Sequence, residues 1–84
     1  MSRYVISYDV DDSKNNQDTY VKVSSFLKQL GGFRITMNVW QVDSAKSSDE
    51  IIGLIRNYIK KEDTILIIRI NQEPTFYNQK KFDD

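Results

Sequence analysis

The chain has 84 residues, with 12 basic and 12 acidic side chains that cancel to a formal net charge of zero. A chain of this length forms one domain with a modest core, and small domains often bury further surface by oligomerising. It contains no cysteine and no histidine, which excludes disulfides, thiolate metal sites, His-based catalysis and His-ligated zinc. Any metal would therefore be a hard cation bound by oxygen, such as magnesium or manganese.

The neutral balance gives no global attraction to nucleic acid, although a local basic patch remains open. The N-terminal apolar run is short and ends in acidic residues, which is not typical of a signal peptide. The longest later apolar run, Ile65 to Ile68, is too short to span a membrane. We therefore expect a cytoplasmic protein that does not interact with membranes.

The first strand is predicted from about Arg3 to Val10 and ends in a carboxylate, Asp9. Its apolar run predicts a strand that is buried on both faces. A charge at the end of such a strand is costly unless it lies at the rim, forms a pair or binds a cation. Asp9 is therefore the first candidate for function. The alternative, a carboxylate that accepts backbone N–H bonds in the next turn, has about equal weight.

A helix is predicted from about Asp18 to Leu30, after a polar connector. Its apolar side chains recur at helical spacing on one stripe: Tyr20, Val23, Phe26, Leu27 and Leu30. Gly31 and Gly32 end it, because glycine adopts the left-handed cap conformation at little cost. Residues 33–43 are then too long for one short strand, and they predict two strands that meet near Met37 and Asn38 without a glycine in the turn.

The second helix begins at a predicted capping box formed by Ser47 and Glu50. Its buried face is predicted to consist of Ile51, Ile52, Ile55, Tyr58 and Ile59. Lys60 and Lys61 are expected in its last turn, where they would complement the helix dipole. The last strand, Thr64 to Ile70, is almost entirely apolar, which indicates a central position in the sheet.

The predicted order is β-α-β-β-α-β over one domain, residues 1–84. Right-handed crossovers then give an α+β ferredoxin-like sandwich, with a four-stranded antiparallel sheet and two helices on one face. The second face must meet solvent, a ligand or a partner, and a homodimer packed sheet to sheet is the simplest cover. The tail, about residues 72–84, is a candidate for an extra strand that pairs with a partner chain.

Three segments together resemble the CRISPR-associated Cas-two family over nearly the whole chain. They are Tyr8-Asp9-Val10 with the following Asp11-Asp12-Ser13-Lys14, residues 32–40 beginning Gly32-Phe33-Arg34, and residues 62–70 beginning Glu62-Asp63-Thr64. The same segments are similar to the virulence-associated protein D ribonucleases and to the SinR-like small proteins.

The resemblance implies a ferredoxin-like homodimer whose two Asp9 side chains face each other and share a magnesium or manganese ion. Within the family, some members are metal-dependent endonucleases, and others are non-catalytic scaffolds that bind DNA. By the same resemblance, Asp9 is the candidate catalytic and metal-binding residue, and Arg34 and Lys14 are candidate nucleic-acid-binding residues. Asp11 and Asp12 could act as outer groups, although solvated turn residues are favoured three to one, roughly.

Each other candidate also has a structural interpretation. Arg34 could bind a phosphate with both guanidinium nitrogens, or it could be a charge that protects an edge strand. Trp40 and Phe33 could stack on bases, although packing is favoured by roughly four to one. Tyr8 could assist the metal site, but a place in the dimer interface is favoured.

Two functions follow. The first is a nucleic-acid-associated homodimer, which could bind DNA or RNA and carry an endonuclease centre at paired Asp9. The second is a non-catalytic dimeric scaffold or regulator in which Asp9 is structural, and a toxin-type ribonuclease is a third reading. The neutral charge slightly favours binding without efficient catalysis.

Overall fold

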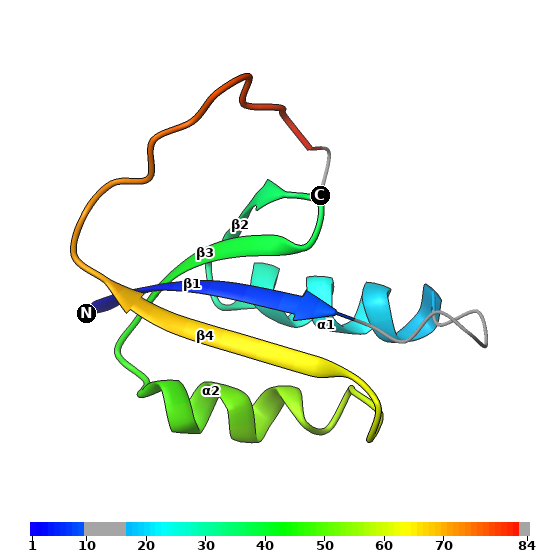
Figure 1. Ribbon diagram of the computed structural model, residues 1–84. Coiled ribbons are helices and arrows are strands. Elements are labelled where there is room, and N and C mark those ends of the chain that lie inside the picture. Colours follow the sequence, from blue (N-terminus) through cyan, green and yellow to red (C-terminus); the bar gives the residue numbers. More distant parts are fainter. Residues whose placement is uncertain (10–16, 83–84) are drawn as a thin grey trace.

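The computed structural model describes residues 1–9 and 17–82 of the chain. Its elements, in chain order, are β1 (Ser2–Asp9), α1 (Gln17–Gln29), β2 (Phe33–Thr36), β3 (Val39–Ser44), α2 (Ser48–Ile55) and β4 (Thr64–Ile70). The predicted β-α-β-β-α-β order is confirmed (Figure 1). None of the helices in the described part has the length and the hydrophobicity needed to cross a membrane.

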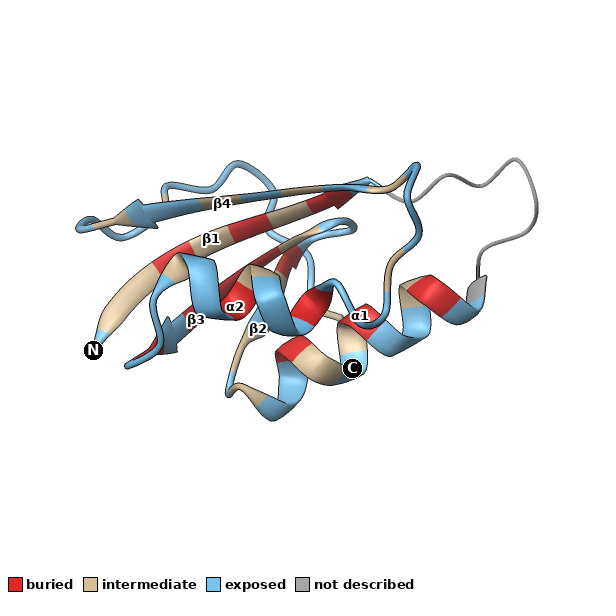
Figure 2. Cartoon of the chain, turned by 90° about the horizontal axis from the view of Figure 1, so that it is seen from below, coloured by how far each residue is buried: buried red, intermediate tan, exposed pale blue. Residues whose placement is uncertain are grey.

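The four strands form one sheet in the order β2-β3-β1-β4, and every pairing is antiparallel. Both helices lie on the same face of this sheet, as Figure 2 shows. This arrangement confirms the predicted ferredoxin-like sandwich. The sheet therefore has a helix-covered face and an open face.

The core forms where one side of the sheet meets the two helices. Alternate residues of β1 (Tyr4, Ile6 and Tyr8) are buried there. The other members of the cluster are Val23 and Leu27 from α1, Trp40 and Val42 from β3, and Ile51 and Ile55 from α2. Because successive side chains of a strand point to opposite faces, Arg3, Val5, Ser7 and Asp9 lie on the open face.

Helix α1 ends at the two glycines, as predicted. The N–H of Gly32 donates to the carbonyl of Leu27, and the N–H of Gly31 donates to that of Lys28, both at 3.0 Å. Gly31 has a φ of 82°, so this is a Schellman cap. A Cβ atom at Gly32 would lie 2.7 Å from Val42 Cγ2, so the chain must approach β3 without a side chain here.

The turn at Met37 and Asn38 joins β2 to β3, as predicted. Arg34 pairs with Trp40 whereas Thr36 pairs with Val39, so β2 carries one extra residue between these pairs. In the described part of the chain, Asn78 is the only non-glycine residue with a positive φ, so this turn is not of the primed type that favours glycine. The β-bulge accommodates the hairpin instead.

Helix α2 begins at the predicted capping box: the Ser47 hydroxyl accepts from the Glu50 N–H, and the Glu50 carboxylate accepts from the Ser47 N–H, both at 3.1 Å. The two hydrogen bonds from Ser47 lower the pKa of the Glu50 carboxyl.

The predicted end of the second helix was wrong, because α2 ends at Ile55. The N–H of Asn57 donates to Leu54 and that of Tyr58 to Ile55, so the chain tightens into a three-residue turn. Lys60 and Lys61 consequently lie outside the helix rather than in its last turn.

Strand β4 has the predicted bounds, but its predicted central position was wrong. It pairs only with β1 and forms one edge of the sheet. Leu66 and Ile68 are 53% and 49% exposed. The continuous apolar sequence therefore reflects an open sheet face with hydrophobic residues on it, rather than burial between two neighbouring strands. For the same reason β1 is fully buried on one face only.

The tail, residues 71–82, contains neither helix nor strand. It leaves the end of β4 and arches past β3 toward the β2–β3 hairpin (Figure 1). Arg3 forms salt bridges with Glu73 in the tail and with Asp43 on β3, and these contacts raise the pKa of the Arg3 guanidinium, chiefly through the Asp43 hydrogen bond. Pairing of the tail with a partner chain stays a prediction.

Candidate functional site: the open face and the end of β1

The open face brings β1 and β4 together in a defined register. Val5 lies opposite Ile68, Ser7 opposite Leu66, and Asp9 opposite Thr64. Val39 of β3 lies opposite Ser7 on its other side. Because directly opposed residues share a face of the sheet, these side chains form one surface.

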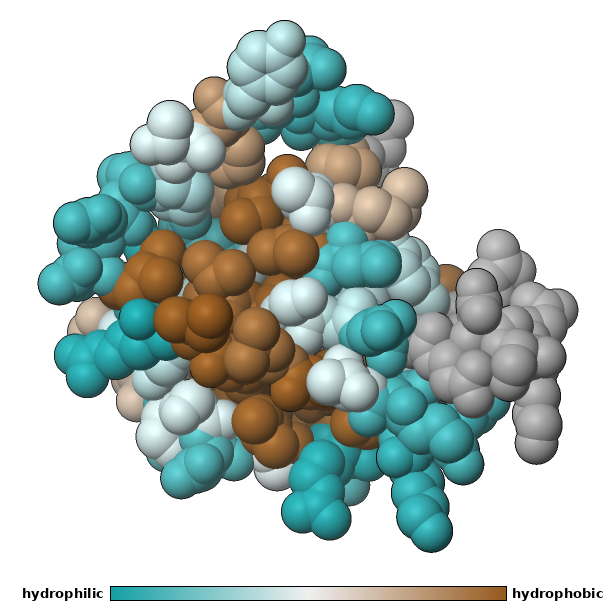
Figure 3. All heavy atoms as spheres, in the orientation of Figure 1, coloured by the Kyte–Doolittle hydropathy of each residue, from teal (hydrophilic) through white to brown (hydrophobic). Residues whose placement is uncertain are grey.

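Four residues of this surface form an apolar patch: Val5, Val39, Leu66 and Ile68. Val5 and Val39 are partly buried, whereas Leu66 and Ile68 are about half exposed. Figure 3 shows hydrophobic atoms gathered over the middle of the open face, with hydrophilic atoms around them. A contiguous apolar surface with a polar rim is typical of an interaction site.

Asp9 lies at the end of β1, next to this patch, and is exposed. One residue, Tyr8, separates it from Ser7, which lies opposite Leu66. The structure thus gives the physical reason why the strand tolerates the charge: Asp9 is at the rim of the sheet and in contact with solvent.

A single chain does not supply a metal site in its described part. No group of three or more Asp and Glu side chains lies close enough there to bind a metal ion. Asp11, Asp12 and Lys14 lie outside the described residues. Magnesium commonly uses one or two carboxylates together with water and substrate phosphates, and Asp9 supplies one such carboxylate per chain.

Tyr8 does not take part in this surface, contrary to both readings made from the sequence. It is buried on the helix-covered face, and its hydroxyl lies 2.9 Å from Ser24 Oγ of α1. It also accepts from Trp40 Nε1 at 3.3 Å. Because successive side chains of a strand point to different faces, Tyr8 and Asp9 lie on different faces of the sheet. Tyr8 therefore cannot assist a metal ion at Asp9 or contact a partner through the open face.

Arg34 projects from β2 toward the helices. Its guanidinium lies 5.1 Å from the ring centre of Tyr20, 5.2 Å from that of Trp40 and 5.5 Å from that of Phe82. It donates to the Met37 carbonyl at 2.9 Å, to Ser24 Oγ at 3.1 Å and to the Tyr20 hydroxyl. The side chain thus links β2, which is an edge strand of the sheet, to α1 and the tail. Its phosphate-binding role stays a prediction.

The two aromatic candidates differ in exposure. Trp40 is 1% exposed and belongs to the core cluster, so the packing interpretation is confirmed and it cannot stack on a base. Phe33 is 51% exposed. Beside it, Gln41 is buried on the open-face side of β3, opposite Val5 and Phe33, and its Oε1 atom has no hydrogen-bond partner among residues 1–9 and 17–82.

Leu66 and Ile68 were not singled out from the sequence. Strand β4 offers apolar residues on both faces, so its sequence does not indicate which alternate set is covered by the helices. The predicted topology alone could have indicated an exposed apolar face, because only one face of the sheet in a two-layer sandwich is covered by helices.

Comparison with known proteins supports the fold alone. No protein-family model matches the chain, and no curated protein matches it. Among solved structures, a hypothetical protein, TT1823 from Thermus thermophilus, superimposes with a TM-score of 0.73 at 18% sequence identity, over 95% of each chain. The chain is therefore an α+β protein of the ferredoxin-like class.

Proposed function

We propose that this chain acts as a homodimer that binds nucleic acid and holds a magnesium or manganese ion between the two Asp9 side chains. The observation that carries the proposal is the position of an exposed carboxylate beside an exposed apolar patch on the open sheet face. The resemblance to the Cas-two family supports the same reading.

The apolar patch supplies the reason to dimerise. A small domain buries too little surface to be very stable by itself, and covering half-exposed leucine and isoleucine side chains adds favourable free energy. A two-fold interface joins the same surface of both chains, so a residue near the axis meets its own copy. Asp9 lies close enough to the patch to be such a residue.

The pairing of two Asp9 side chains would supply two carboxylates, and magnesium commonly uses one or two in proteins. A divalent ion held there would neutralise phosphate charge and lower the pKa of a bound water. The protein's own part is to position Asp9 at the end of β1, a central strand of the sheet. The neutral net charge of the chain slightly favours binding of nucleic acid without efficient cleavage.

The test compares the variant Asp9→Asn with the control variant Asp49→Asn. Asp49 is an exposed acidic residue on α2, away from the open face. Manganese binding is measured by calorimetry, and cleavage of labelled RNA and duplex DNA is followed with magnesium or manganese. We expect Asp9→Asn to abolish manganese binding and any cleavage, whereas Asp49→Asn behaves as wild type. Equal metal binding by all three proteins would refute the Asp9 site.

A second variant separates the dimer from the carboxylate. Ile68→Lys places a charge in the apolar patch and leaves Asp9 in place. Sedimentation is expected to show a wild-type dimer and an Ile68→Lys monomer, and the monomer should lose manganese binding as well. A wild-type monomer at high concentration, or a monomeric variant that still binds manganese, would exclude the shared site.

Nucleic-acid binding distinguishes the remaining readings. A duplex DNA binder without cleavage is the scaffold, whereas cleavage of RNA alone is the toxin-type ribonuclease. In either case the affinity must fall as salt rises, because counterions are released from the phosphates.

A further inference from the structure

The neutral net charge of the chain conceals an uneven distribution on the helical side. Helix α2 has acidic residues, Asp49 and Glu50, in its first turn and no basic residue in its last turn. The cations follow beyond the helix, at Arg56, Lys60 and Lys61, all of which are exposed. Three basic residues therefore lie between α2 and β4, and two acidic residues, at positions 62 and 63, follow them before the strand begins.

These cations surround a pocket of about 510 Å3 that lies between α2 and the start of β4. Its apolar lining consists of Ile52, Ile59 and Ile65, and its charged lining of Arg56, Lys60, Lys61 and Asp63. Three cations therefore oppose one carboxylate. The Asp63 carboxylate also accepts a hydrogen bond from the Lys60 backbone N–H at 2.8 Å.

The helix dipole does not explain this cluster. Cations stabilise a helix within its last turn, and the effect fades beyond it. Lys60 and Lys61 lie well past Ile55, where α2 ends. In the part of the chain that the structure describes, Arg56 and Lys61 form no salt bridge. A concave surface with one dominant charge and low-dielectric walls concentrates the field that attracts an oppositely charged ligand.

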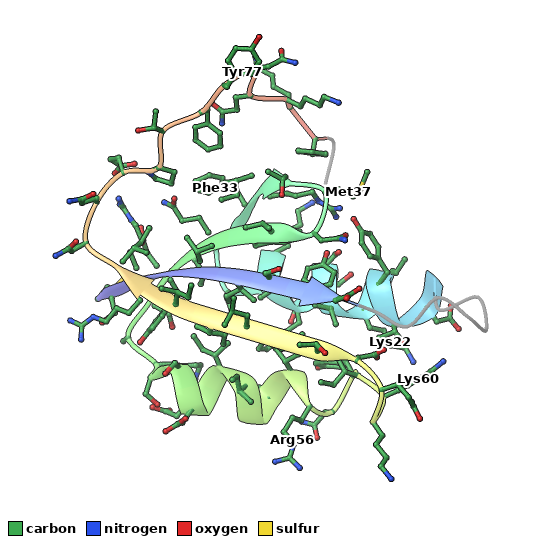
Figure 4. The ribbon with its side chains drawn as sticks, in the orientation of Figure 1. Lys22, Phe33, Met37, Arg56, Lys60 and Tyr77 are labelled. Atoms are coloured by element: carbon green, nitrogen blue, oxygen red, sulfur yellow. The ribbon has the colours of Figure 1, made fainter. Side chains whose placement is uncertain are left out.

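The position of the cluster connects it to Asp9. Lys60 and Lys61 lie in the connection to β4, separated from it by two acidic residues, and the first residue of β4, Thr64, pairs with Asp9. Figure 4 shows Lys22 of α1 and Lys60 on the side of the molecule where β1 ends, with Arg56 projecting below α2. The pocket lies on the helical side of the sheet, so a partner chain on the open face would leave it accessible.

We propose that the pocket formed by Arg56, Lys60 and Lys61 binds the phosphate backbone of the nucleic acid. This inference rests on the proposed function and adds the path of the strand to it. Arg56 can hold a phosphate through two nitrogens, and the lysines act as point charges. The connection that carries the two lysines leads into β4, whose first residue pairs with Asp9 at the end of β1.

The test measures binding of labelled duplex DNA and labelled RNA by fluorescence anisotropy, with EDTA present so that the Asp9 site does not contribute. The variant is Lys60→Ala with Lys61→Ala, and a second variant is Arg56→Ala. The matched control is Lys80→Ala with Lys81→Ala, an exposed lysine pair in the tail. All substituted side chains are exposed, and circular dichroism verifies that each variant is folded.

We expect the Lys60 and Lys61 variant to bind duplex DNA roughly tenfold more weakly, with little change for the tail pair. The slope of log affinity against log salt should decrease by about 0.9 for each phosphate contact removed. Equal losses in the two lysine variants would overturn this inference and leave the proposed function intact. No wild-type binding to DNA or RNA, or binding to anionic phospholipid vesicles instead, would overturn both.

Discussion

The two faces of the sheet differ in how far their hydrophobic side chains are buried. On the covered face, Ile6 and Trp40 are almost completely buried against the helices. On the open face, Leu66 and Ile68 keep about half of their surface exposed although they are no less hydrophobic. Burial of any of these hydrophobic side chains would be favourable. The fold, which places both helices on one face of the sheet, decides which of them are buried within one chain.

The largest predicted effect comes from making the same substitution, leucine to alanine, on each side of the sheet and comparing the loss in the free energy of unfolding. Leu27→Ala on α1 removes a fully buried side chain and should lower the free energy of unfolding by roughly 2–5 kcal/mol. Leu66→Ala should lower it by about 1 kcal/mol or less at concentrations where the chain is monomeric. Urea denaturation measures both. Equal losses would mean that the open face is covered in the isolated chain.

The next prediction compares two arginines that both contact the tail. Arg34 on the covered side packs among three rings and donates to three oxygens, so Arg34→Ala should lower the free energy of unfolding by about 2 kcal/mol. Arg3 on the open face forms exposed salt bridges, and Arg3→Ala should cost less. The ranking is checked by thermal and urea denaturation, and the reverse order would contradict it.

The smallest effect concerns the capping box that secures the helical layer. Ser47→Ala should lower the free energy of unfolding by about 1 kcal/mol. The pKa of Glu50 is lowered in the folded state, so its contribution is present at neutral pH and is lost as the pH falls through that lowered pKa.

The Glu50→Gln variant has no carboxylate at this position, so its free energy of unfolding should lack the contribution that wild type loses at acidic pH. Urea denaturation between neutral and acidic pH measures it in wild type and variant. A difference between them that stays constant with pH would show that the Glu50 carboxylate does not stabilise the cap.

Local features of the fold were predictable because each depends on neighbours in sequence. The glycine pair that ends α1, the capping box at Ser47 and the turn at Met37 and Asn38 all lie where the residues indicated. The end of α2 was not predictable from periodicity, because Tyr58 and Ile59 keep helical spacing while the backbone tightens after Ile55. Tyr8 also misled, since adjacency to Asp9 in sequence means the opposite face in a strand.

By itself, the sequence determined the order of elements, the caps and the candidate carboxylate Asp9, since periodicity and turn chemistry act over a few residues. Only the tertiary structure decided which alternate residues of β1 and β4 meet the helices, and that Arg34 points inward while Leu66 and Ile68 remain exposed. The physical reason is that β4 offers apolar residues on both of its faces. The side on which both helices pack selects one face of the sheet for the core and leaves the other face exposed, with Asp9 at its rim.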